Sequence, residues 1–172
     1  MHALRRFIHA VDYFTERSGR ALAWLSLALA LTTALVVLLR YGMGLGSVAL
    51  QDSITYLHAL LFMLGAAFTL RRDGHVRVDI FYRRFSDRGK AWVDAVGAIL
   101  FLLPFCLFLF AISLPFVMDA WRILEGSPDP GGIHAVFLLK SLIPLMALSL
   151  ILQGAAELAR HILTLIEPEQ DR

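Results

Sequence analysis

Charged residues are scarce in this sequence, and cysteine is almost absent. Only 17% of the 172 residues are charged and 58% are hydrophobic, whereas about a quarter of an average soluble domain is charged. The single cysteine, Cys106, cannot form a disulfide within the chain, which excludes a disulfide-stabilised scaffold. The sequence also lacks a Ser/His/Asp grouping, a Cys/His set with metal-ligand spacing and a glycine-rich phosphate loop. We therefore expect neither an enzyme nor a bound cofactor.

The basic charge is too weak to indicate nucleic-acid binding. The formal net charge is +2, and the basic residues lie at the ends of long uncharged runs. Basic residues in that position determine the orientation of membrane helices. The sequence therefore predicts membrane lipids as partners and no nucleic acid.

Four uncharged runs dominate the sequence, and they cover Ala21–Leu39, Ser53–Leu70, Ala95–Met118 and Ser141–Ala156. A membrane-spanning helix needs about 20 mainly apolar residues. The last run reaches that length if it begins near Ala135, with the Lys140 ammonium extending to the membrane surface. We predict an all-α integral membrane protein with a single domain, 1–172, and four spans near 21–40, 53–70, 93–118 and 135–158.

The distribution of basic residues predicts the orientation of these spans. The N-terminal segment, the loop between the second and third spans and the C-terminal tail contain 13 of the 16 lysines and arginines. Short loops rich in basic residues stay on the cytoplasmic side. Both termini are therefore expected to be cytoplasmic.

Residues 4–20 have an amphipathic helical pattern before the first span. Leu4, Phe7, Ile8, Val11 and Phe14 or Tyr13 recur at helical spacing, opposite Arg5, Arg6, Asp12 and Glu16. Two interpretations remain open, an N-terminal helix in the membrane interface or a solvated helical extension of the first span.

Capping and glycine residues predict where the helices begin and end. Asp52 or Ser53 is expected to open the second helix, where an acidic residue suits the helix dipole. Gly74 is expected to end that helix in a left-handed conformation. Ser86 is expected to cap the third helix, and Gly126 to end it.

Two loops carry distinctive polar residues. After Arg71 and Arg72, the residues His75, Arg77 and Asp79 alternate with apolar residues, which predicts an extended inner segment with one polar face. On composition alone, a basic loop that binds anionic lipid is an equal alternative. Glu125 and Lys140 flank a turn rich in proline and glycine on the outer side, where they can form an ion pair.

This layout resembles the small permease subunit (DctQ type) of tripartite ATP-independent periplasmic (TRAP) transporters. The segments that carry the resemblance are Leu-Arg-Arg-Asp-Gly-His-Val-Arg-Val-Asp at 70–79 and Glu-Gly-Ser-Pro-Asp-Pro-Gly-Gly-Ile at 125–133, with Lys-Ser-Leu-Ile-Pro at 140–144. The second region is similar to the branch labelled mannitol/chloroaromatic transport. Many members have an acidic pair where this chain has Gln51-Asp52, so only Asp52 is carried over.

The resemblance implies a location in the bacterial inner membrane and two protein partners. A large DctM-type permease would hold the substrate and sodium sites, and a DctP-type periplasmic protein would deliver an organic acid. The small subunit would brace the permease. Its signature residues would contact lipid headgroups and the large subunit, and these are Arg71, Arg72, His75, Arg77 and Asp79.

Two other functions are compatible with four apolar helices. A stand-alone channel or exporter would require several copies to enclose a pore. A four-helix membrane electron carrier would require two histidines at matching depth to hold haem. His58 is the sole histidine within a predicted span, and His134 is the other candidate on that side.

Overall fold

The computed structural model describes residues 1–75 and 82–166, and every regular element in these ranges is a helix. The elements are α1 (His2–Gly42), α2 (Val48–Arg71), η1 (Tyr82–Arg84), α3 (Asp87–Gly97), η2 (Ala98–Leu102), α4 (Leu103–Arg122) and α5 (Val136–Ile166). In the described ranges, 4 helical stretches are long and apolar enough to cross a membrane, and the third runs without a break from α3 through η2 to α4. The predicted all-α membrane fold is confirmed.

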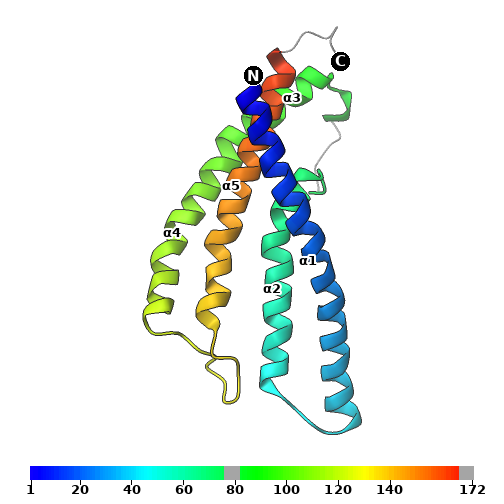
Figure 1. Cartoon of the computed structure of the whole chain (residues 1–172), viewed down its shortest axis with the longest axis vertical. Helices are drawn as coiled ribbons and strands as arrows, with labels where there is room; N and C mark the ends of the chain where they lie inside the picture. The colour runs from blue at the N-terminus through cyan, green and yellow to red at the C-terminus, as the bar shows by residue number, and fades with distance from the viewer. Residues whose placement is uncertain (76–81, 167–172) are drawn as a thin grey trace.

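The helices form two hairpins that meet along α5 (Figure 1). Helix α1 packs against α2, and α4 packs against α5, which also contacts α1, α2 and α3. The N-terminus and the last turns of α5 lie at the top of Figure 1, and the α1–α2 and α4–α5 loops lie at the bottom. Following the predicted orientation, we call the end with the N-terminus and the last turns of α5 the inner end. The end with the α1–α2 and α4–α5 loops is the outer end.

Small residues fill the interior, and most large apolar side chains face outward. Ala147 and Ala156 of α5 are fully buried, whereas leucines and phenylalanines of α1 and α4 are exposed. Small residues let membrane helices approach closely, and lipid covers the large apolar ones. At the crossing of α1 and α2, a Cβ on Gly19 would overlap the Phe68 ring. This glycine therefore permits the close contact between the two helices.

Serine residues cap two of the helices. Ser47 accepts a hydrogen bond from the Leu50 N–H at 3.4 Å, so α2 begins one turn before Asp52. The expected start at Asp52 or Ser53 is therefore wrong, because Ser47 satisfies the free N–H groups first. Ser86 accepts from the Gly89 N–H at 3.2 Å and caps α3, as predicted.

Helices α2 and α4 end before Gly74 and Gly126, the glycines that were expected to end them. Asp73 (φ 53°) adopts the left-handed conformation that was expected of Gly74, and Leu124 (φ 46°) adopts it two residues before Gly126. In both cases the next N–H bonds a carbonyl five residues back, at 2.9 Å for Gly74 and 3.0 Å for Glu125. This hydrogen-bond pattern satisfies the free carbonyls at a helix end without glycine at the left-handed position.

Pro104 changes the hydrogen bonding of the third stretch. It has no N–H to donate, and the helix widens just before it at η2, where the Leu103 N–H bonds the Ala98 carbonyl five residues back. A turn of this width inside an α-helix is a common response to an interrupted hydrogen-bond ladder. The change of helical geometry before Pro104 is therefore local to η2.

The N-terminal pattern forms part of α1 and not a separate helix. The structure corresponds to the helical extension, with one difference in which side is buried. Ile8, Thr15 and Gly19 are buried, whereas Tyr13 and Phe14 are exposed. The apolar face of this segment is turned partly outward, because its polar residues have partners at α2 and α5.

Candidate functional site

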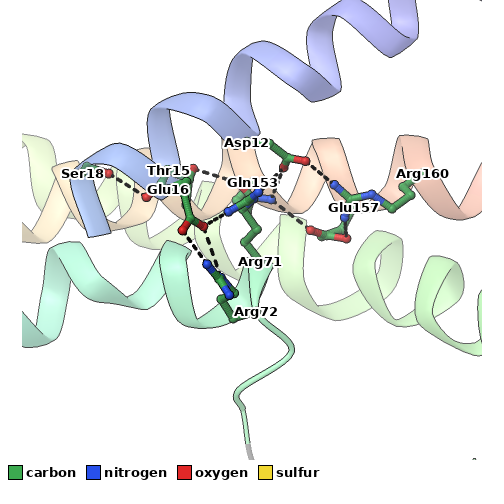
Figure 2. A network of polar contacts seen from close by, with 9 residues as sticks. All are labelled: Asp12, Thr15, Glu16, Ser18, Arg71, Arg72, Gln153, Glu157 and Arg160. Atoms are coloured by element: carbon green, nitrogen blue, oxygen red, sulfur yellow. Dashed lines mark hydrogen bonds and ion pairs between the residues drawn. The ribbon is translucent and has the colours of Figure 1, made fainter. Parts of the chain in front are cut away.

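A network of polar side chains joins α1, α2 and α5 at the inner end of the bundle (Figure 2). Three carboxylates face three guanidinium groups around one buried amide. The members are Asp12, Thr15 and Glu16 of α1, Arg71 of α2 with Arg72 directly after it, and Gln153, Glu157 and Arg160 of α5.

Gln153 lies at the centre of this network and is 0% exposed. Its Oε1 accepts a hydrogen bond from Thr15 Oγ1 at 2.8 Å. Its Nε2 donates to Asp12 Oδ1 at 3.1 Å and to Glu157 Oε1 at 2.9 Å. Both amide protons and the carbonyl are therefore satisfied, which is the condition for burying a side-chain amide without a large free-energy cost.

Glu16 connects α1 to α2. Its carboxylate accepts hydrogen bonds from Arg71, and from Arg72 at 3.2 Å (Nε) and 2.5 Å (Nη2). Arg20, one turn further along α1, adds a bond of 3.0 Å. The hydrogen bond and charge of Glu16 raise the pKa of the Arg72 guanidinium above its ordinary value. The end of α2 is therefore attached to α1 by a two-pronged ion pair.

Asp12 connects α1 to α5. Arg160 Nη2 lies 2.6 Å from Asp12 Oδ2, and Arg71 Nε lies 3.4 Å from Oδ1. Arg160 also pairs with Glu157 on its own helix. Each carboxylate of the network has a guanidinium partner, so the arrangement suits holding three helices together.

The five residues predicted to make contacts at the inner loop do not all lie in this network. Arg71 and Arg72 are in the network and bind acids of the same chain, while His75 is exposed. Arg77 and Asp79 lie outside the described residues. The two arginines nearest the span therefore serve the fold directly, through contacts that the loop motif alone did not indicate.

The predicted outer residues lie together around the α4–α5 loop. Lys140 Nζ is 2.5 Å from Glu125 Oε2 and 4.2 Å from the centre of the Phe116 ring. Asp52 Oδ2 accepts a hydrogen bond from the Ile133 N–H at 2.8 Å, which fixes the outer turn to α2. A Cβ on Gly132 would come within 2.6 Å of Asp52, so the turn requires glycine there.

Removing the Lys140 ammonium should loosen the outer turn. Lys140→Met leaves the Glu125 carboxylate, whose side chain is 30% exposed, without its partner. We expect the free energy of unfolding to fall by about 1–2 kcal/mol, because a partly buried carboxylate loses its counter-ion. Unfolding of the variant in mixed micelles, followed by circular dichroism, measures this change. Lys140→Arg should retain most of the stability, and equal stability of Lys140→Met and wild type would contradict the prediction.

Several members of the inner network were missed by the sequence reasoning. They are Asp12, Thr15, Glu16, Gln153, Glu157 and Arg160. One signal was present, because Gln153, Glu157 and Arg160 are spaced four and three residues apart and lie on one face of a helix. A polar residue within a span usually faces the bundle interior. Their partners on α1 required the three-dimensional packing.

The two histidines considered for haem do not match in position. His58 lies within α2 and is exposed, and His134 lies in the loop before α5.

The searches of curated proteins and of solved structures gave no match. A family model, described as the DctQ component of tripartite ATP-independent periplasmic transporters, matches residues 29–164. This range covers most of the chain, from within α1 almost to the end of α5. The chain belongs to the DctQ family, whose members are membrane components of tripartite transporters.

Proposed function

We propose that this chain is the small, bracing subunit of a sodium-driven transporter in the bacterial inner membrane. A large permease subunit would carry the substrate and sodium sites. A periplasmic binding protein would deliver an organic acid to that permease. The small subunit would hold the fixed part of the permease in place while the transporting part moves.

The inner network is the observation that carries this proposal. Three helices are joined by Gln153, Asp12 and Glu16 through mutually satisfied contacts. Such a network resists relative movement of the helices, because separating them would leave charged groups without partners. A rigid bundle suits a brace better than a moving carrier.

The distribution of charge supports placing the transport path elsewhere. The charged residues lie toward the two ends of the chain's helices, and each of the four apolar runs contains none. Transport paths for anions and ions use polar groups or broken helices at membrane depth. An organic acid and its coupling ions are therefore assigned to the large subunit.

The inner loop belongs to the same proposal. We assign His75, Arg77 and Asp79 to contacts with anionic lipid headgroups and with the large subunit, because a basic loop at the cytoplasmic surface attracts both. Charge reversal in Arg77→Glu or Asp79→Lys should lower the amount of large subunit that co-purifies. Wild-type assembly and uptake in both variants would contradict this assignment.

Affinity purification from native membranes tests the proposed function. Tagged chain is solubilised in mild detergent, and mass spectrometry identifies its partners. We expect a large hydrophobic permease in equimolar amount, and sodium-dependent uptake in liposomes when the permease and binding protein are included. A homo-oligomer without permease, or solute transport by this chain alone, would contradict the bracing function and favour a stand-alone channel.

A further inference from the structure

Helix α2 has a polar stripe on its exposed side. The structure describes all of this helix, and its four exposed residues are Gln51, Thr55, His58 and Phe62. They are spaced four, three and four residues apart, which places them on one face of the helix. Ala67, the buried residue of α2, lies on the opposite face. Three hydrogen-bonding side chains of α2 therefore lie on the face that does not pack within the described part of this chain.

The polar groups of this stripe have no hydrogen-bond partner within residues 1–75 and 82–166. The His58 ring is stacked on Phe62, with centroids 6.2 Å apart and planes at 10°, which orients the ring without satisfying its nitrogens. Two exposed hydroxyls of α1 behave differently. Thr33 Oγ1 of α1 donates to the Leu29 carbonyl at 2.7 Å, and Ser26 Oγ donates to Ala23 at 2.6 Å. Those residues can face lipid because their own helix satisfies them.

Hydrocarbon cannot satisfy the α2 stripe. His58 is ten residues from the start of the 24-residue helix, about 15 Å along its axis at 1.5 Å per residue. Polar side chains at such depth normally face a protein interior or a water-filled cavity. Here the exposed position of His58 in the isolated chain indicates a surface that another protein covers.

Gly65 continues the stripe toward the inner end. It lies seven residues after His58, on the same face, and no atom lies within 4 Å of a Cβ built on it. Small residues in this position allow a second helix to approach closely, so that its side chains can reach hydrogen-bonding groups nearby. The stripe thus combines hydrogen-bonding groups toward the outer end with open space toward the inner end.

We propose that a transmembrane helix of the large permease subunit packs against this stripe and supplies a hydrogen-bonding side chain or carbonyl at the depth of His58. This inference rests on the proposed function, which provides the membrane partner. The partner helix is expected to carry serine, threonine, asparagine, glutamine or a carboxylate facing His58. The exposed face of α2 is therefore the contact that joins the two membrane subunits.

Photo-cross-linking tests which helix covers α2. Benzoyl-phenylalanine is placed at Phe62, which is 71% exposed, and in a matched chain at Phe101 of α4, which is 73% exposed. Illumination of native membranes should give a Phe62 product with the mass of this chain plus the permease. A product with twice the mass of this chain, lipid adducts alone, or a permease product from Phe101 without one from Phe62 would overturn the proposal.

Removing the polarity of His58 gives an independent test. His58→Leu should reduce the permease that co-purifies about 3- to 10-fold, the change expected for one lost interhelical hydrogen bond. The isolated subunit should unfold at the wild-type temperature, and the control Thr33→Val should change neither quantity. Wild-type co-purification, or earlier unfolding of the isolated variant, would overturn the proposal. If the wild-type chain recovers no permease at all, the proposed function fails instead.

Discussion

Replacing Gln153 with leucine is expected to lower the free energy of unfolding by about 1–3 kcal/mol. Leucine has a similar volume, so the main change is the loss of the hydrogen bonds to Thr15, Asp12 and Glu157. These three groups remain in a largely buried site without the amide that joined them. Unfolding of the purified subunit in mixed micelles, followed by circular dichroism, measures the loss.

Ser149→Ala is the matched control for this prediction. Ser149 lies one turn before Gln153 on α5, and its hydroxyl donates to the Met146 carbonyl of its own helix. Its removal should change the free energy of unfolding by less than about 0.5 kcal/mol. Equal stability of Gln153→Leu and Ser149→Ala would show that the buried amide does not hold the helices together.

Reversing the charge of Asp12 should release the inner half of α1 from α5. An arginine at this position would face Arg160 and Arg71, the two cations that Asp12 now binds. Because Asp12 is largely buried and Arg160 is partly exposed, we expect a loss of about 2–3 kcal/mol, below the value for a fully buried pair. Maleimide labelling of Ile8→Cys, in a Cys106→Ser background, reports release of the helix, since Ile8 is 7% exposed.

Two further variants test the cause of this change. Asp119→Arg alters an exposed ion pair with Arg122 within α4, and it should have almost no effect on stability. Asp12→Arg combined with Arg160→Asp restores one ion pair and should recover part of the lost stability. Slow labelling of Ile8→Cys in the Asp12→Arg chain would contradict the proposed attachment.

The membrane fold could be predicted from the sequence because span length and charge depend on local composition. The inner network could not, for a reason visible at Tyr13 and Phe14. In a soluble protein, an amphipathic helix buries its apolar residues and exposes its charged ones. That pattern would place these aromatic residues inside and Asp12 and Glu16 outside. In a bundle surrounded by lipid, large apolar side chains can face outward, and ionised groups seek partners inside. In this structure Tyr13 and Phe14 therefore face outward, and Asp12 and Glu16 face inward.

The ion pair at the outer turn was easier to predict than the inner network, because its two charged residues flank one short segment. Glu125 and Lys140 are close along the chain, and the intervening glycines and prolines allow the chain to reverse. Asp52 shows the limit of this reasoning. Its partner is the Ile133 N–H, 81 positions away in the sequence, and no local pattern connects them.

The central position of α5 has a consequence for biogenesis. Helix α5 leaves the ribosome after α1 and α2, yet it supplies Gln153 and Arg160 to side chains of α1. While the nascent chain is incomplete, Glu16 can already bind Arg72, but Thr15 and Asp12 lack their α5 partners. The contacts between α1 and α5 can therefore form only after α5 has been synthesised. Truncating the chain before α5 would remove the Arg160 partner of Asp12 and the Gln153 partner of Thr15, and would leave Asp12 paired with Arg71 of α2.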